Sequence, residues 1–156
     1  IGLGIPAEPL FRSRDVIGEC MIDSNRLSGS HIENHGQLEI NKSHLKNSDS
    51  KNLILNGESA FLGVIDCEIM NNRSLKSAIF NLGENAVVKK TVFEENKSEM
   101  EHADDIYNKT GMTLDDVDIR SEEPTIFNEG TLLVKGRRFV PEKVFKQIGK
   151  CCHIDL

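Results

Sequence analysis

Apolar and polar positions recur along the chain with a period of about twenty to twenty-seven residues. The pattern Ile-x-Asn occurs five times, and a glycine follows each copy within three residues. The copies are Ile32-Glu33-Asn34, Ile54-Leu55-Asn56, Ile79-Phe80-Asn81, Ile106-Tyr107-Asn108 and Ile126-Phe127-Asn128. A repeat of this length is typical of a solenoid, in which each period forms one supersecondary unit.

A second pattern, apolar-x-x-small-x-apolar, runs in phase with the first. Its clear copies are Ile17/Cys20/Ile22, Ile40/Ser43/Leu45, Val64/Cys67/Ile69, Val88/Thr91/Phe93 and Leu114/Val117/Ile119. Stretches rich in asparagine and serine follow these copies and indicate turns. The two patterns predict two short strands in each period.

These strands predict an all-β, right-handed parallel β-helix of about five to six coils over residues 10–139. Equivalent residues of successive coils would stack about 4.8 Å apart. The isoleucines would then fill the core. The asparagines would form a ladder of hydrogen-bonded amides, Asn34, Asn56, Asn81, Asn108 and Asn128. A β-sandwich is the main alternative, but it would not explain two patterns kept in phase.

The repeats resemble those of a known superfamily. The segments Ala78-Ile79-Phe80-Asn81-x-Gly83 and Val88-x-x-Thr91-x-Phe93-x-x-Asn96 are similar to repeats of the pectate-lyase-like right-handed β-helices, and within them to those of polymorphic membrane proteins. The resemblance implies the fold. It leaves the function open, because such folds include lyases, hydrolases, adhesins and scaffolds.

The two ends do not follow the repeat. Residues 1–9 are expected to be extended, the remnant of a longer chain. Residues 140–156 are expected to form a capping helix and a tail. Pro141, Glu142 and Gly149 suit the two ends of a helix over Pro141–Lys150, which would cover the open edge of the last coil.

The middle residue of Ile-x-Asn suggests a binding surface. Neighbouring residues of a strand point to opposite faces, so this column would lie outside if the isoleucines lie inside. The predicted interaction face is Leu55, Phe80, Tyr107 and Phe127. An apolar stripe of this kind marks contact with a protein partner, a neighbouring domain or a second copy. Sugar stacking is one alternative, and burial of the column under a loop of the same chain is another.

The charged residues include candidates for catalysis. Lyases and glycosidases with this fold need clustered acids for calcium with an arginine base, or paired carboxylates. The candidates are Asp104, Asp105, Asp115, Asp116, Asp118, His102, Arg12, Arg14, Arg137 and Arg138. None has the required order or spacing, so the sequence predicts no catalytic residue, no metal and no cofactor.

Charge and cysteine content restrict the possible partners and the cellular compartment of the protein. The net charge of -6 argues against a nucleic-acid partner, and no apolar run is long enough to span a bilayer. Cys20 and Cys67 share a column two coils apart, about 9.6 Å, which is too far for a disulfide. Two free, buried thiols favour a cytoplasmic location, whereas the resemblance implies the cell surface or secretion.

The sequence therefore predicts a non-catalytic interaction module of a larger protein. The alternative is a carbohydrate-binding or polysaccharide-degrading domain.

Overall fold

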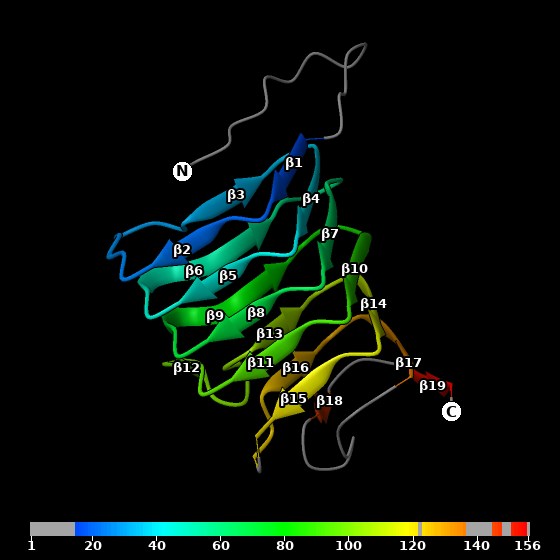
Figure 1. Cartoon of the computed structure of the whole chain (residues 1–156). Helices are drawn as coiled ribbons and strands as arrows, with labels where there is room; N and C mark the ends of the chain where they lie inside the picture. The colour runs from blue at the N-terminus through cyan, green and yellow to red at the C-terminus, as the bar shows by residue number, and fades with distance from the viewer. Residues whose placement is uncertain (1–14, 122, 137–144, 148–150, 156) are drawn as a thin grey trace.

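The computed structural model is a right-handed parallel β-helix of about five turns, as predicted (Figure 1). It describes residues 15–121, 123–136, 145–147 and 151–155. The expected extended segment 1–9 lies outside these residues. Three parallel sheets form the walls, and every strand pair joins one coil to the next.

Each of the first five coils contributes a strand to each of three sheets. Sheet A contains β1 (Asp15–Gly18), β4 (Gln37–Asn41), β7 (Phe61–Ile65), β10 (Asn85–Lys89), β14 (Gly111–Asp115), β17 (Thr131–Lys135) and β19 (Cys151–Asp155). Sheet B contains β2 (Met21–Asp23), β5 (His44–Lys46), β8 (Glu68–Met70), β11 (Val92–Glu94) and β15 (Asp118–Arg120). Sheet C contains β3 (Ile32–Asn34), β6 (Asp49–Asn56), β9 (Arg73–Asn81), β12 (Lys97–Ser98), β13 (Ile106–Asn108), β16 (Ile126–Asn128) and β18 (Phe145–Gln147).

The prediction of two strands per period was wrong, because the second pattern covers two strands and the corner between them. In the second coil, Ile40 is the last buried apolar residue of the sheet A strand. Ser43 lies at the corner, and Leu45 belongs to the sheet B strand. The residue before the small one has a positive φ at every such corner: Glu19, Lys42, Asp66, Lys90 and Asp116, with φ between 46° and 56°. This left-handed backbone turns the chain from one sheet into the next.

The predicted core column is confirmed. Ile32, Ile54, Ile79, Ile106 and Ile126 are fully buried and lie in register on neighbouring strands of sheet C. Apolar residues of sheets A and B face them, among them Leu38, Val64, Phe93 and Leu114. One continuous apolar core therefore runs through the coils.

The asparagine ladder is also confirmed. Asn34 Nδ2 donates to Asn56 Oδ1 at 2.9 Å, and the chain of bonds continues through Asn81 and Asn108 to Asn128 at 2.8–2.9 Å. All five side chains are buried. The glycine after the ladder is required by close packing, because a Cβ on Gly83 would lie 2.3 Å from the carbonyl oxygen of Ala60.

The capping-helix prediction was wrong where the structure can test it. Residues Phe145–Gln147 form β18, which pairs with β16, and Cys151–Asp155 form β19, which pairs with β17 (Figure 1). An open sheet edge offers unpaired N–H and C=O groups, and an extended strand satisfies them where a helix would not. Residues 141–144 and 148–150 lie outside the described part of the chain.

Candidate functional site

The predicted interaction column is stacked but covered. Leu55, Phe80, Tyr107 and Phe127 lie in register, with ring centroids 4.9 Å apart for Phe80–Tyr107 and 5.1 Å for Tyr107–Phe127. The expectation that they are exposed was wrong for Phe80 and Tyr107, which are 6% and 4% exposed. Leu55 and Phe127 are half-buried.

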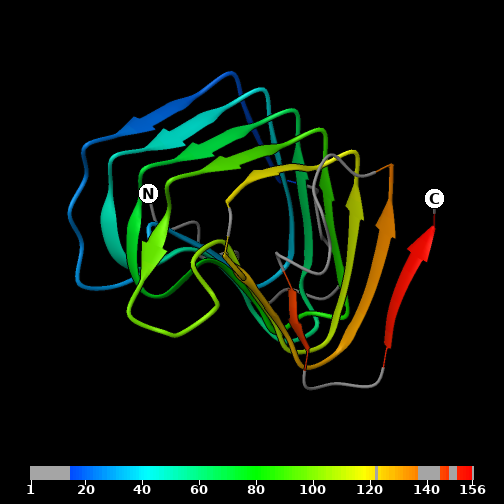
Figure 2. The ribbon, with the colours of Figure 1, turned by 90° about the horizontal axis from the view of Figure 1, so that it is seen from below.

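The cover is the loop of residues 99–105 between β12 and β13. Ala103 is fully buried within the aromatic cluster, and Met100 packs against it. Figure 2 shows this loop leaving the wall of the solenoid before β13 begins. The burial alternative is therefore confirmed for Phe80 and Tyr107. The sequence contained a sign of this burial. Met100 and Ala103 are apolar residues within the acidic segment 99–105, and the apolar Leu82 directly follows Asn81.

Tyr107 is held at its polar end as well. Its hydroxyl donates to Glu129 Oε1 at 2.5 Å. Burial raises the pKa of Tyr107 well above its ordinary value, and the hydrogen bond to Glu129 raises it further. The phenol therefore stays neutral and anchors the column to the turn after β16.

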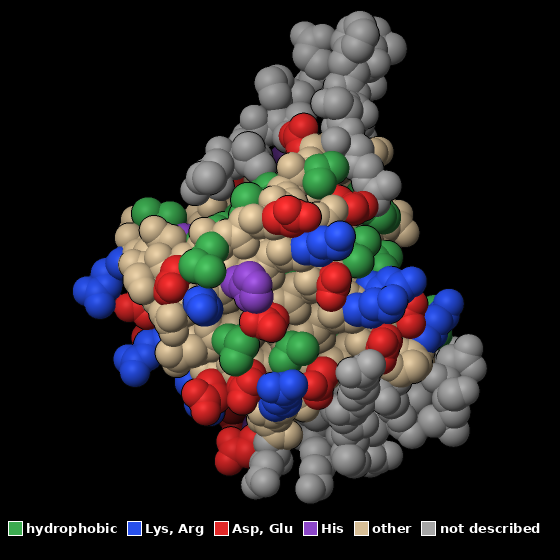
Figure 3. Space-filling view, viewed as in Figure 1, with side chains coloured by type: hydrophobic (Ala, Val, Ile, Leu, Met, Phe, Trp, Pro, Cys, Tyr) green, Lys and Arg blue, Asp and Glu red, His purple; other side chains and the backbone are tan. Residues whose placement is uncertain are grey.

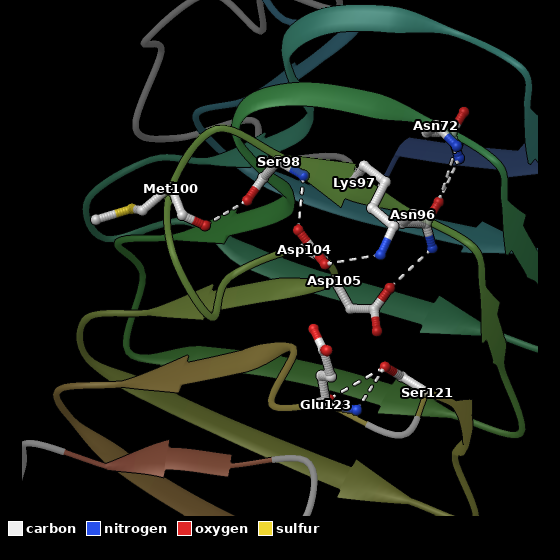
Figure 4. A network of polar contacts seen from close by, with 9 residues as sticks. All are labelled: Asn72, Asn96, Lys97, Ser98, Met100, Asp104, Asp105, Ser121 and Glu123. Carbon is white, nitrogen blue, oxygen red and sulfur yellow. Dashed lines mark hydrogen bonds and ion pairs between the residues drawn. The ribbon is translucent and has the colours of Figure 1, made fainter.

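A second polar ladder, not predicted, lines the corner between sheets B and C (Figure 4). The backbone N–H of Ser48 donates to Asn72 Oδ1 at 3.1 Å, and Asn72 Nδ2 donates to Asn96 Oδ1 at 3.0 Å. Asn96 Nδ2 then donates to Asp105 Oδ1 at 2.8 Å. In the sequence, the stretches rich in asparagine and serine indicated only turns at this corner.

The aspartates of the covering loop fasten it to this corner. Asp105 is 3% exposed, and burial raises its pKa to about 6, with the charge of Asp104 adding to the effect. Asp104 accepts a hydrogen bond of 2.7 Å from the backbone N–H of Ser98 and lies 3.8 Å from Lys97 Nζ. Both carboxylates are thus engaged within the chain (Figure 4).

The other catalytic candidates do not converge. Asp115 pairs with Lys89 at 3.6 Å, and Asp118 pairs with Arg120 at 3.0 Å. Nε2 of His102 lies 3.1 Å from Oε1 of Glu101. Arg12, Arg14, Arg137 and Arg138 lie outside the described residues. Among the residues that the structure describes, no group of three His, Cys, Asp or Glu side chains could hold a metal ion.

Cys20 and Cys67 differ in environment. Cys67 is buried and Cys20 is exposed, and both are free. Burial of Cys20 was predicted wrongly, because the first coil forms the end of the described solenoid and Cys20 has a neighbouring coil on one side. Burial raises the pKa of the Cys67 thiol.

Two of the hollows on the described surface bear on function. One, of about 600 Å³, lies over β14 and β17 of sheet A. It is lined by Glu84, Thr110, Gly111, Met112, Thr113, Thr131 and Leu133. The other, the corner groove, has about 430 Å³ and crosses three coils where sheet B meets sheet C. It is lined by Asp49, Ser50, Arg73, Ser74, Leu75, Lys97, Ser98 and Glu99.

Sheets A and B present different outer faces. Figure 3 looks onto sheet B, where acidic, basic, histidine and hydrophobic side chains lie side by side. The outward residues of sheet A include the half-buried Phe61, Ile65, Val87 and Leu133. Together with the hollow beside them, these residues are called the sheet A face.

Comparison with known proteins adds no relative: no family model, curated protein or solved structure matches the chain. The fold alone defines its class, a right-handed parallel β-helix. Within the described residues, no helix is long and apolar enough to cross a membrane.

Proposed function

We propose that this chain is a non-catalytic interaction module that associates with a second copy of itself through the sheet A face. The predicted interaction column is not proposed as the contact surface, because Phe80 and Tyr107 lie beneath the 99–105 loop. The observation that carries the proposal is the hollow of about 600 Å³ beside half-buried apolar side chains on the outer face of sheet A.

The composition of the sheet A face supports an interface. Outward positions of a solvated sheet are normally polar, whereas Phe61 and Ile65 on β7 and Val87 on β10 are apolar. Leu133 continues the apolar surface on β17. Charged residues lie around it: Glu84, Lys89, Asp115 and Lys135. An apolar centre with a polar rim is the usual anatomy of a protein interface.

The strand register supports a self-complementary contact. A two-fold axis along the strands, between β10 and β14, exchanges β10 with β14 and β7 with β17. Lys89 and Asp115 are register partners, so Lys89 of one copy would lie over Asp115 of the other. Phe61 would lie over Thr131, which lines the hollow, while Gly63 would lie over Leu133 and Ile65 over Lys135. Such a contact is isologous and closes as a dimer.

The proposal also includes the superfamily of the chain and its cellular compartment. The repeats Ala78–Gly83 and Val88–Asn96 support membership of the pectate-lyase-like superfamily. The free thiols of Cys20 and Cys67 support a reducing compartment. The carbohydrate-binding alternative is favoured by a different feature, the corner groove.

The test compares two matched substitutions. Val87→Lys places a charge in the sheet A face, and Val92→Lys places the same charge at a half-buried outward position of sheet B. Light scattering should give a dimer mass for the wild type and for Val92→Lys, and a monomer mass for Val87→Lys at the same concentration. A wild-type protein that stays monomeric at high concentration would refute the proposal.

A further inference from the structure

We infer that the corner groove is a binding site for a neutral, hydroxyl-rich chain, an oligosaccharide lying along the solenoid axis. The groove lies where sheet B meets sheet C, and none of its lining residues belongs to the sheet A face. The inference is therefore independent of the proposed self-association.

The groove is built from equivalent residues of three successive coils. Ser50, Ser74 and Ser98 are register partners, as are Asp49, Arg73 and Lys97. Successive members of each column are separated by the strand spacing of about 4.8 Å. The groove therefore repeats its polar groups along the axis, which suits a ligand made of repeated units.

Two serine hydroxyls at this site lack partners. Ser50 and Ser74 are 8% and 6% exposed, and neither Oγ has a hydrogen-bond partner among the residues that the structure describes. Hydroxyls at the corner between sheets A and B are satisfied: Ser43 Oγ donates to Asn41 O at 2.8 Å, and Thr91 Oγ1 donates to Lys89 O at 3.0 Å. Buried polar groups in folded proteins are normally paired, so two orphans on one groove point to a missing partner.

The two hydroxyls can reach a ligand. No hydrogen bond holds either serine in its present rotamer, and rotation about χ1 turns a hydroxyl between three staggered positions. Both residues line the hollow of about 430 Å³. A ligand hydroxyl in the groove would give each serine a donor and an acceptor.

The charges of the groove favour a neutral ligand. Asp49 and Glu99 balance Arg73 and Lys97. Asp49 pairs with Arg26 at 3.4 Å and Lys97 with Asp104 at 3.8 Å, while the exposed Arg73 forms no ion pair with another described residue. A polyanion would meet two carboxylates. A sugar hydroxyl both donates and accepts, so it can bond to either sign.

An apolar contact completes the site. Leu75 is 50% exposed at the groove wall, next to Ser74. The C–H face of a sugar ring can pack against such a side chain while its hydroxyls face the serines. With one aliphatic contact and no exposed ring among the lining residues, we expect affinity on the order of 1 mM.

The experiment titrates the intact chain with neutral tetra- to hexasaccharides of glucose, mannose, galactose and xylose, followed by amide chemical shifts. Saturable shifts at residues 49–50, 73–75 and 97–99 are expected with at least one of them. The double variant Ser50→Ala, Ser74→Ala should weaken binding roughly tenfold and keep its fold, because it removes two unpaired hydroxyls. Ser59→Ala, an exposed serine outside the groove, is the matched control.

Three outcomes would overturn the inference. The first is no saturable shift at about 10 mM sugar. The second is binding of oligogalacturonate or of a mixed-charge peptide in place of every neutral sugar. The third is unchanged affinity in the serine variant. Binding by Val87→Lys as strong as by the wild type would show that the groove acts separately from the sheet A face.

Discussion

The amide of Asn96 donates a 2.8 Å hydrogen bond to the buried carboxylate of Asp105, and this bond joins the second ladder to the loop over the aromatic column. The ladder thus ends on an ionisable group. The loop that hides Phe80 and Tyr107 is fastened by a carboxylate whose protonation changes near neutral pH.

Asp105 should make the protein less stable as pH rises from about 4 to about 6. Burial raises its pKa to about 6 in the folded chain, against about 3.9 in an unfolded one. Between these values the folded state holds a proton that the unfolded state has lost, so the free energy of unfolding falls with increasing pH. The loss is about 3 kcal/mol at most and is complete above the folded pKa.

The substitution Asp105→Asn should remove this dependence and raise stability at pH 7. Denaturant unfolding at several pH values measures it, with the exposed Glu58→Gln as control. The difference in stability between Asp105→Asn and the wild type should grow from pH 4 to pH 6. A difference that stays constant over this range would show that Asp105 titrates normally.

Removing one rung of the first ladder should destabilise the solenoid strongly. The side chain of Asn81 bonds to Asn56, Asn108, the N–H of Gly83 and the carbonyl of Gly111. Asn81→Ala leaves several of these groups buried without partners, at about 1–3 kcal/mol each for the worst placed. Urea unfolding should show a midpoint far below that of Asn85→Ala, an exposed asparagine four residues later. Equal midpoints would mean that the ladder contributes little.

The aromatic column should behave as core. Phe80→Ala removes a side chain that packs against Tyr107 and the covering loop, so it should cost about 3–5 kcal/mol. Leu75→Ala, at a half-exposed position on the same strand, should change stability by less than about 0.5 kcal/mol. Thermal unfolding compares the two. A Phe80→Ala protein of normal stability that loses its association would restore the original exposed-face hypothesis.

Cys20 and Cys67 should label at different rates in the folded protein. The exposed Cys20 should react with a maleimide under native conditions, whereas the buried Cys67, with its raised pKa, should react only after unfolding. Peptide mapping by mass spectrometry assigns the label to each site. Rapid native labelling of Cys67 would contradict its burial.

The sequence predicted those features in which the same residue type recurs in the same place. Ile54 and Ile79 take the same core position, and Asn56 and Asn81 take the same turn, because stacked coils present equivalent environments to equivalent residues. The free state of Cys20 and Cys67 followed from the same stacking.

Other features depend on segments outside the repeat. Alternation along the strand showed that Phe80 lies outside sheet C, but it could not show that Met100 and Ala103 fold over it. The pattern after Pro141 fits a helix locally, yet the open edge of β16 pairs with Phe145–Gln147 as a strand. In each case a tertiary contact decided the outcome.

One repeated triplet, Asn-x-Ser, contributes both to the second ladder and to the corner groove. Asn72-Arg73-Ser74 and Asn96-Lys97-Ser98 place an asparagine in the second ladder and a serine in the corner groove on successive coils. Asn72 and Asn96 are buried and their amides are bonded. These triplets match the acceptor sequence for N-linked glycans, but in the folded state the two asparagines are not accessible for it.

The in-register pairing of strands also bears on how such a chain can change in length. Each coil touches the coil before it and the coil after it, so no residue must meet a distant part of the rod for the wall to close. Excision of a whole period, from Gly57 through Asn81, would bring Asn56 next to Asn108 and leave the remaining rungs aligned. This protein can therefore gain or lose entire coils. A closed barrel cannot, because its strands form a fixed circumference.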